Sequence, residues 1–433
     1  MAQRKRRRHL RPSVTAAILV IIVALLFVGL CIFKSCNTPD TPKPPVTDNT
    51  ATPNEIENQD QPIVPPEIEP EVEPVPQETR LTFVAFGDNL IHSSIIEDGE
   101  RLASEYNTGT KYYFDPMYEN FKEIVSGADI AFINQETPIA GPDFPAAGYP
   151  NFNTPDEMGE TLIRLGFDVI NTATNHMLDC RGKGLLYHAD YWASKADLGV
   201  MQIGSYKNKE DYNDIRVYEK DGVKIAFLAY TYSTNGMPTG AGYEDIYIPL
   251  PDEAELTRQV KEARELADLV FVSMHWGWED SFDPNQDQRN QAQALVDAGA
   301  DVIIGTHPHV IQEMKWKENA EGHKTLIAYS LGNFISTMYY PWNMFGGYLS
   351  LDIVKDENGA RVENPLFNPT MCHYSLTRRS LKMYTLENYS QELYETHGTT
   401  LKSSAYSYDK IIAKVKSTIS EEFLSDYYIN YGN

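Results

Sequence analysis

The chain is poor in cysteine and in positive charge. Its 433 residues include 4 cysteines, two of which (Cys31 and Cys36) lie beside a long apolar run, so a disulfide scaffold is excluded. The other two, Cys180 and Cys372, could form one disulfide or remain two buried thiols. Lysine and arginine total 37 against 61 aspartate and glutamate residues, which gives a formal net charge of −24. Such a surface excludes nucleic acid as a partner and repels anionic substrates unless bound cations reverse the field locally.

The signatures of several common enzyme classes are also absent. The sequence has no G-x-S-x-G elbow, no P-loop and no G-x-G-x-x-G turn, and neither Cys180 nor Cys372 has an obvious base beside it. A glycosidase site built from two carboxylates remains possible because acidic residues abound. That site would leave the histidines described below unexplained.

The N-terminal residues are predicted to anchor the protein in a cell membrane as a single-pass span. Residues 14–33 form an apolar run of 20 residues, enough for a helix that crosses a bilayer. Six basic residues precede it, so the positive-inside rule makes residues 1–12 cytoplasmic, residues 13–34 the signal-anchor and the rest of the chain extracellular. A cleaved signal peptide, or a lipid attached to Cys31 or Cys36, is the alternative.

Residues 35–79 are predicted to be a disordered linker. Positions 37–79 hold 11 prolines and 10 acidic residues with almost no apolar periodicity, so the segment cannot bury enough apolar surface to fold. A near-polyproline chain extends by roughly 3.1 Å per residue and would serve as a stalk. A charge-rich interaction tail is the alternative.

A globular domain is expected over residues 80–355. Apolar β-branched runs alternate there with helical patterns, which predicts a layered α/β fold. The expected strands are 81–87, 129–134, 167–171, 223–230, 268–274, 301–304 and 326–330. The expected helices are 155–165, 182–195, 252–266 and 286–298. Residues 356–433 form a Tyr-rich C-terminal extension that is expected to be partly helical, with one amphipathic stretch near residues 411–423.

Side chains that bind metals follow the expected strands at the points where the strands end. In an open α/β sheet, ligands bind at the carboxyl ends of the strands, so residues far apart in sequence gather at one edge. Carboxylate, amide oxygen and imidazole together are the donors of a divalent-metal centre. The candidates are Asp88, Glu136, Asn175, His275, His307 and His309.

Each candidate has an ordinary explanation when taken alone. Gly87-Asp88 is a common strand-end turn, a lone carboxylate such as Glu136 is usually an N-cap, and Asn175-His176 could be an Asx-turn. His92 could reach the same site or simply open the next helix. Five strand ends that all offer Asp, Glu, Asn or His are improbable if every one is such a case, so the set predicts a metal centre. The histidines without such context are expected to be structural or exposed: His188, His323, His373 and His397.

Six short motifs occur in an order that resembles one family. They are Gly87-Asp88, Asn134-Gln-Glu136, Asn175-His176-x-x-Asp179, His275-Trp-Gly, Gly305-x-His307-Pro-His309 and Ser330-Leu-Gly-Asn333-Phe. This ordered set, over roughly residues 81 to 340, is similar to the CapA family of poly-γ-glutamate capsule synthesis proteins, also called the PGA-cap domain. A membrane anchor followed by an extracellular domain also resembles the layout of that family.

The resemblance implies a fold and a set of metal ligands. The CapA family is similar to calcineurin-like metallophosphoesterases, which have a four-layer αββα sandwich and two divalent metal ions at the strand ends, here Mn, Zn, Mg or Fe. Glu136 resembles the carboxylate that bridges the two ions. One ion would take Asp88, His309 and His92, and the other would take Asn175, His275 and His307.

The resemblance also implies catalytic and substrate-binding residues. His176 resembles the histidine that protonates the leaving group, with Asp179 orienting it. The implied substrate contacts are Asn134, Trp276 and Asn333. Two motifs depart from the phosphoesterase pattern: Asp88 and His92 are four residues apart in place of Asp-x-His, and Asn134-Gln-Glu136 replaces Gly-Asp-x-x-Asp.

The resulting hypothesis is a membrane-anchored extracellular hydrolase or transferase that depends on divalent metal and acts on a cell-envelope polymer. The resemblance implies that the polymer is poly-γ-glutamate or a similar anionic polymer, and that the role is capsule biosynthesis or export alongside other membrane proteins of that process. Two alternatives remain. One is a non-catalytic scaffold of a membrane export complex, and the other is a polymer-binding module positioned by the stalk.

Overall fold

The computed structural model of the protein describes residues 78–400 and 407–432. The predicted cytoplasmic segment 1–12 and signal-anchor 13–34 lie outside these residues, as does nearly all of the predicted linker. Within the described residues, no helix combines the length and the apolar character needed to cross a membrane.

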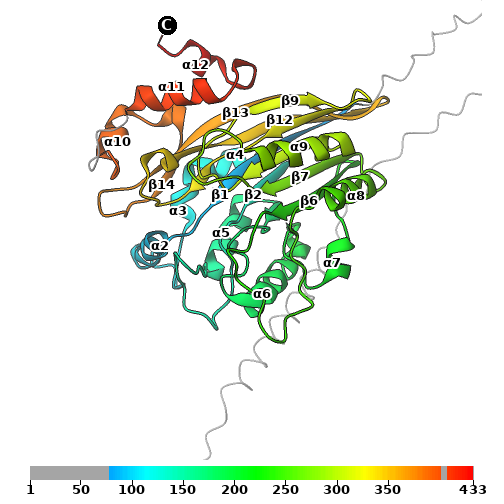
Figure 1. Cartoon of the computed structure of the whole chain (residues 1–433). Coiled ribbons are helices and arrows are strands. Elements are labelled where there is room, and N and C mark those ends of the chain that lie inside the picture. Colours follow the sequence, from blue (N-terminus) through cyan, green and yellow to red (C-terminus); the bar gives the residue numbers. More distant parts are fainter. Residues whose placement is uncertain (1–77, 401–406, 433) are drawn as a thin grey trace, which may run out of the picture. The chain divides into compact units, whose positions relative to one another are not determined.

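The described residues form an α/β sandwich of two mixed sheets (Figure 1), so the predicted sandwich architecture is confirmed. The larger sheet has eight strands, with β11 (Asn333–Ile335) beside β1, and runs in the order β14 (Lys382–Thr385), β13 (Gly359–His373), β12 (Phe345–Asp356), β1 (Thr79–Asn89), β2 (Ile130–Asn134), β3 (Val169–Asn171), β4 (Met201–Ile203). The smaller sheet has six strands in the order β5 (Arg216–Lys220), β6 (Val223–Thr231), β7 (Leu269–His275), β8 (Val302–Thr306), β10 (Lys324–Ala328), β9 (Met314–Glu318).

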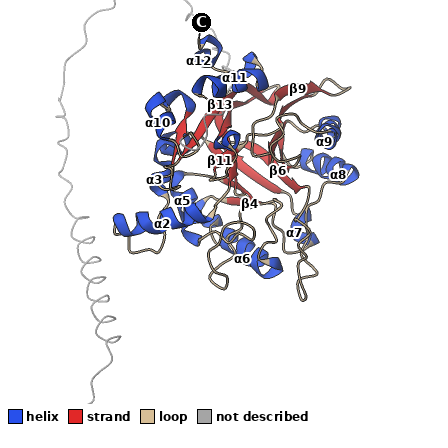
Figure 2. Cartoon of the chain, turned by 60° about the vertical axis from the view of Figure 1, so that its left-hand side comes forward, coloured by secondary structure: helices blue, strands red, loops and turns tan. Residues whose placement is uncertain are grey.

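Helices cover the outer faces of both sheets. Figure 2 shows α8 and α9 on one side of the strands, and α2 and α5 on the other. The α-helices of the described residues are α2 (Ser93–Glu105), α3 (Asp115–Tyr118), α4 (Lys122–Ser126), α5 (Asp156–Leu165), α6 (Arg181–Ala193), α7 (Lys209–Asn213), α8 (Glu253–Arg264), α9 (Gln286–Ala298), α10 (Gln391–Thr396), α11 (Tyr408–Thr418) and α12 (Asp426–Asn430). The short 3₁₀ turns are η1 (Glu119–Phe121), η2 (Ala196–Leu198), η3 (Pro341–Met344), η4 (Leu386–Asn388) and η5 (Glu421–Phe423).

The predicted strands and helices are confirmed. They could be predicted because the central elements have strong sequence signals, namely continuous apolar runs in the strands and capping residues at the helix ends. Every residue of β2, β3, β7 and β8 is buried, as the continuous apolar runs of parallel strands with two covered faces require. The helix α9 begins at a capping box between Asn285 and Gln288, and α5 ends at Gly166, whose φ of 102° suits glycine.

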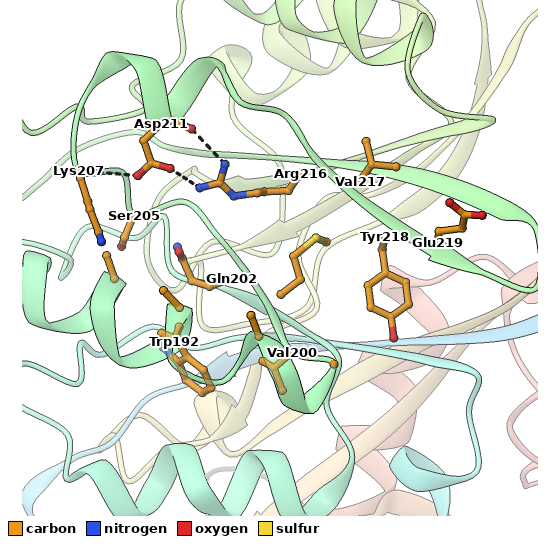
Figure 3. Close-up of a pocket in the computed structure, with 15 residues that line it drawn as sticks. Trp192, Val200, Gln202, Ser205, Lys207, Asp211, Arg216, Val217, Tyr218 and Glu219 are labelled. Atoms are coloured by element: carbon orange, nitrogen blue, oxygen red, sulfur yellow. Dashed lines mark hydrogen bonds and ion pairs between the residues drawn. The ribbon is translucent and has the colours of Figure 1, made fainter.

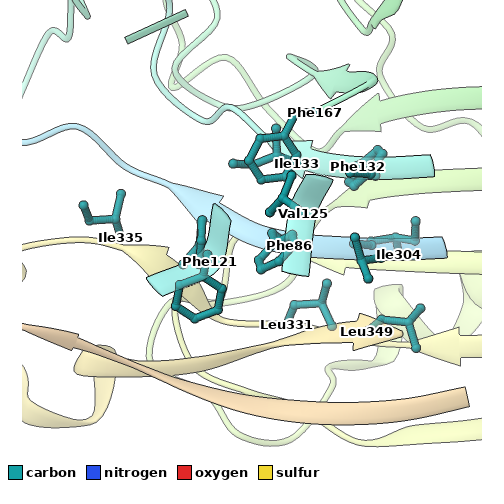
Figure 4. Packing of buried hydrophobic residues seen from close by; sticks show 14 of the residues in the cluster. Phe86, Phe121, Val125, Phe132, Ile133, Phe167, Ile304, Leu331, Ile335 and Leu349 are labelled. Atoms are coloured by element: carbon teal, nitrogen blue, oxygen red, sulfur yellow. The ribbon is translucent and has the colours of Figure 1, made fainter. Parts of the chain in front are cut away.

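Two phenylalanines of β1, three positions apart, face two different layers. The ring of Phe83 contacts Phe227 and Phe271 of the smaller sheet, at centroid distances of 6.4 and 5.1 Å. The ring of Phe86 points to the other side, where it meets Phe121 of the helical layer at 5.8 Å (Figure 4). The apolar cluster around these rings therefore joins sheet to sheet and sheet to helix, and it fixes the position of the residue pair that follows Phe86.

The larger sheet continues past residue 355, where the domain was predicted to end. The strands β12 and β13 form a long antiparallel hairpin next to β1. The residues of β12 alternate between buried and partly exposed positions, so the strand has no continuous apolar run of the kind that marks β7. In the predicted extension, α11 coincides with the start of the expected amphipathic stretch and buries Ile411, Ile412 and Val415.

The two described cysteines are separate buried thiols. Cys180 donates a hydrogen bond to the carbonyl oxygen of Phe152, and Cys372 donates one to that of Ser336. Burial raises the pKa of both thiols, to about 11 for Cys180 and about 12 for Cys372. Of the two open interpretations, free thiols are therefore the one that the structure supports.

Truncation of Phe86 is expected to destabilise the fold strongly. Its fully buried ring contacts four aromatic side chains, and Phe→Ala changes at such sites cost about 3–5 kcal/mol. Urea denaturation of Phe86→Ala should show this loss in the free energy of unfolding. The control Tyr106→Ala removes an aromatic ring that is 57% exposed, and its effect should stay within about 0.5 kcal/mol. Equal effects of the two changes would contradict the assigned packing.

Candidate metal centre

Asp88 lies near the end of β1, where a glycine allows two strands to approach closely. A Cβ atom at the preceding residue, Gly87, would lie 2.0 Å from the carbonyl oxygen of Gly332. Because no side chain is present there, β11 pairs with the end of β1, and the Asp88 N–H donates to the Gly332 carbonyl at 3.0 Å. The carboxylate of Asp88 is fully buried.

A row of amides across the strand ends orients Asp88. The Asn134 Nδ2 donates to Asp88 Oδ1 at 2.8 Å, and the Asn171 Nδ2 donates to Asn134 Oδ1 at 2.6 Å. Asn171 accepts in turn from the backbone N–H of Ala173 at 3.1 Å. Since Asp88, Asn134 and Asn171 are all buried, this chain of hydrogen bonds leaves the Asp88 carboxylate with one orientation.

Three histidines come from the smaller sheet. His275 is the last residue of β7, and His307 and His309 follow β8 in a turn. Both turn histidines have left-handed backbone, with φ of 95° for His307 and 58° for His309, a strained conformation that places both side chains on the same site. The His307 N–H donates to Asp88 at 3.3 Å, and His309 Nδ1 lies 3.1 Å from Asp88 Oδ2.

The histidines from one sheet meet the carboxylates and amide from the other. The Oε1 atom of Glu136 lies 3.9 Å from His275 Nε2 and 3.7 Å from His309 Nε2. His275 Nε2 is also 2.9 Å from Asn175 Oδ1. One donor atom each from Glu136, His307 and His309 fall within 4.8 Å of one another, a group that could hold a metal ion.

The buried polar atoms of this group fit a cation. Neither carboxylate oxygen of Glu136 has a hydrogen-bond partner among the described residues, and His307 Nδ1 has none either. The Glu136 side chain has no exposed surface. A buried charge without a partner costs several kcal/mol, whereas a divalent ion between carboxylate and imidazole would satisfy both.

The pKa values of the ionisable groups in the centre are shifted by burial and by one another. Burial raises the pKa of Glu136 well above its usual value, and nearby Asp88 raises it further against the effect of His309. Burial lowers the pKa of His275 and His307 well below the usual value, and neighbouring histidines add to this, so both rings are neutral, the form that binding of a metal requires. Burial acts in the same direction on His309, but Glu136 and Asp88 outweigh it and raise the pKa of His309 to about 10.

A histidine–aspartate pair lies beside the centre. His176 Nδ1 is 2.9 Å from Asp179 Oδ2, and that oxygen also accepts from the backbone N–H of Phe152 at 2.8 Å. The ring of Phe152 packs edge-on against His176 at a centroid distance of 4.7 Å. These contacts fix the ring of His176 and leave its Nε2 as the nitrogen available to a substrate.

The structure brings together most of the predicted ligands and leaves one apart. Asp88, Glu136, Asn175, His275, His307 and His309 are mutual neighbours through the contacts above. His92 directly precedes α2, where its Nδ1 accepts a 3.4 Å hydrogen bond from the Thr337 N–H and its ring lies 5.6 Å from that of Phe152. Burial and then the charge of His309 lower the pKa of His92 to about 3. His92 therefore borders the centre and has no hydrogen bond or ion pair to Asp88 or Glu136 within the described residues.

The three predicted substrate contacts are each buried and bonded to protein groups. Asn134 lies between Asp88 and Asn171. Asn333 Oδ1 is 3.0 Å from His309 Nδ1, so this amide orients a histidine. Trp276 packs under α9 and donates its indole N–H to the Tyr329 carbonyl. Exposed fractions of 1% or less leave Asn134, Trp276 and Asn333 no surface that a substrate could reach.

Two residues that were not predicted, Tyr232 and Thr306, contact the histidines. Tyr232 follows β6 and packs against the ring of His307 at 4.5 Å, and it is 41% exposed. Thr306 Oγ1 lies 3.0 Å from His275 Nδ1. The signal for Tyr232 was available, since it also follows an expected strand of the same sheet.

A separate pocket of about 610 Å³ lies between the edge strands β4 and β5 (Figure 3). It contains none of the residues of the metal centre. Its cationic side chains are already paired, Arg216 with Asp211 and Lys207 with Asp190. Neither cationic side chain of this pocket is therefore free, and the predicted metal ligands lie elsewhere, at the strand ends.

Comparison with known proteins identifies one family model and several relatives. The model described as bacterial capsule synthesis protein PGA_cap matches residues 82–338. The PGA biosynthesis protein CapA of Bacillus subtilis is 32% identical over 225 residues, which cover 51% of this chain and 57% of the relative. The capsule biosynthesis protein CapA of Bacillus anthracis is 27% identical over 264 residues, 59% of this chain and 60% of the relative. Both matches thus span less than two thirds of the relatives' length.

Among solved structures, the NAD nucleotidase of Haemophilus influenzae aligns with 79% of this chain and 60% of its own. The TM-score of that alignment is 0.40 and the sequence identity is 11%.

Metal binding is expected to depend on Glu136. Saturating Mn²⁺ should stabilise the native protein by about 2.7 kcal/mol at a hundredfold excess over the dissociation constant. In Glu136→Gln, which keeps the size of the side chain, most of this stabilisation should disappear in a thermal unfolding assay. The control Glu357→Gln alters an exposed turn and should respond to Mn²⁺ as the wild type does. Identical metal responses of all three proteins would contradict the assigned centre.

Metal affinity is expected to rise with pH. The pKa values of Glu136 and His309 are raised in the metal-free site, so the site holds protons near neutral pH that a metal ion must displace. The affinity should increase by roughly tenfold per pH unit for each proton displaced, from pH 6 to 8. Titration calorimetry in buffers of different ionisation enthalpy would count the released protons. Release of none would contradict the assigned electrostatics.

Proposed function

The chain belongs to the family of bacterial capsule synthesis proteins PGA_cap, and on that basis we propose that it is a divalent-metal-dependent hydrolase or transferase acting on an anionic capsule polymer, poly-γ-glutamate or a similar chain. The observation that carries the proposal is the buried Glu136 carboxylate, whose oxygens have no hydrogen-bond partner in the described residues and lie among three histidines. A carboxylate buried in this way suits a bound cation, which supports chemistry that depends on metal.

Two ions fit the distribution of the donors. Asp88, Glu136 and His309 would hold one ion, and Asn175, His275, His307 and the shared Glu136 would hold the other. The donor set of carboxylate, amide oxygen and imidazole suits Mn, Zn, Mg or Fe. When bound, the ions would supply Lewis-acid polarisation of the attacked group and a water of lowered pKa.

The residues of the chain supply orientation and a proton. Asp179 accepts from His176 Nδ1 and so directs Nε2 to the substrate. In a hydrolysis, one bond to the leaving group breaks, a water oxygen replaces it, and the leaving group takes a proton that His176 Nε2 can donate. Tyr232 and Phe152 pack against His307 and His176 and keep water from the backs of both rings.

Exposed aromatic side chains near the centre suit a large substrate. Tyr149 is 76% exposed and contacts Phe152, which in turn contacts His176. Trp278 is 67% exposed and follows β7 by three residues. Such side chains provide contact area beyond the reacting group.

The proposal retains the arrangement expected from the sequence. The signal-anchor at residues 13–34, with basic residues before it, would anchor the protein in the cell membrane. Residues 35–79 would hold the catalytic domain away from the outer surface. Other membrane proteins of capsule synthesis or export are the expected partners.

Replacement of His176 is expected to remove catalysis and retain metal. His176→Asn should lower kcat by at least about 100-fold, because a positioned general acid contributes that much or more. The measurements are turnover of phosphoester and γ-glutamyl substrates with Mn²⁺, Zn²⁺ or Mg²⁺, together with elemental analysis of each protein. His323→Asn, outside the centre, serves as the control and should keep both activity and metal. A wild type that binds metal yet turns over neither substrate class would overturn the enzymatic proposal and favour a scaffold.

A further inference from the structure

Arg378 lies in a turn outside the part of the chain that the family model matches. The turn joins β13 and β14 and is closed by the Arg378 N–H, which donates to the Ser375 carbonyl at 2.8 Å. The Ser375 N–H donates to the Arg379 carbonyl, also at 2.8 Å. Arg378 has left-handed backbone, with φ of 57°, and a half-buried side chain, whereas the next residue, Arg379, is exposed. The two arginines thus share one turn and differ in how their side chains are held.

The guanidinium of Arg378 is held by an aromatic ring and by no carboxylate. Its Cζ atom lies 3.5 Å from the centroid of the Tyr339 ring, a cation–π contact. Within residues 78–400 and 407–432, it forms no ion pair, although most other arginines there do. In a chain with a net charge of −24, a fixed cation without a carboxylate is a site for an external anion. Stacking leaves the edge of the guanidinium, with its N–H donors, free for two parallel hydrogen bonds.

Direct contacts connect this turn to the border of the metal centre. The Tyr374 hydroxyl donates to the Met338 carbonyl at 3.2 Å, next to Tyr339. The preceding residue, Thr337, donates its N–H to His92, whose ring lies against Phe152. Phe152 in turn contacts His176. The charge of Arg378 also contributes to the lowered pKa of His92, after burial and His309.

We propose that Arg378, stacked on Tyr339, binds an oxyanion of the substrate, a carboxylate or a phosphate, at the His92 side of the metal centre. This proposal rests on the proposed function and adds the group that selects anionic substrates. The anion sits on the guanidinium edge while the reacting bond lies at the metal ligands, so Arg378 is a specificity residue that does not touch the reacting atoms. Its contribution is made equally in the ground state and the transition state, and therefore affects binding more than turnover.

The test measures binding to the full chain loaded with Mn²⁺, so it does not require turnover. The probes are a γ-glutamyl oligomer, which offers carboxylates, and inorganic phosphate, and the two arms distinguish the source of the oxyanion. Arg378→Gln should weaken binding of at least one probe by about tenfold, the size of one charge-assisted hydrogen bond. Arg378→Lys should recover part of the loss, because the charge returns without the planar donor pair.

The matched control is Arg379→Gln, which removes the same charge from the same turn. Its affinity for both probes should equal that of the wild type. Equal losses in Arg378→Gln and Arg379→Gln would show diffuse attraction and overturn the proposal, as would unchanged binding in Arg378→Gln. The variant Tyr339→Leu leaves the arginine in place without its stacking partner and should show an intermediate loss. If turnover fails while Arg378→Gln still loses affinity, the enzymatic proposal falls and the anion site remains.

Discussion

A buried carboxylate that receives no hydrogen bond from any described residue is the constraint around which this fold is arranged. Glu136 has no exposed side-chain surface and lies among the nitrogens of His275 and His309 at distances longer than a hydrogen bond. Donors placed against it would have made it an ordinary buried polar group. Without such donors, the carboxylate oxygens suit a cation as their partner, and the surrounding residues are arranged so that they do not bond to these oxygens.

The two sheets of the sandwich hold the residues of the centre in position. Asp88, Glu136 and Asn175 lie at or just after the ends of strands of the larger sheet, whereas His275, His307 and His309 lie at or just after the ends of strands of the smaller sheet. The aromatic contacts of Phe83 with Phe227 and Phe271 hold the two sheets together beneath the strand ends. The geometry of the centre therefore depends on packing in the core, because a change in the spacing of the two sheets would change the distances between the donor atoms.

The central part of the fold, and the gathering of the predicted ligands other than His92 at the strand ends, could be predicted from sequence for a physical reason. Parallel strands covered on both faces need continuous apolar runs, and those runs point to the residue at which each strand ends. β12 and β13 escaped prediction because their partly exposed face interrupts the apolar pattern. The hydrogen bonds of Asn134 to Asp88 and of Asn333 to His309 could not be predicted, because sequence spacing places an amide at a strand end and does not reveal whether a neighbouring carboxylate or imidazole already uses it. No sequence motif pointed to Arg378, because its contact with Tyr339 depends on two turns that meet only in the folded structure.

The division of the donors between the sheets has a mechanical consequence. The two bound ions would together link three strands of the larger sheet to two strands of the smaller sheet. Separation of the layers would then require rupture of coordination bonds as well as loss of aromatic contact. The rate at which the two sheets separate, and with it the exposure of the core to proteases, would then depend on the concentration of metal.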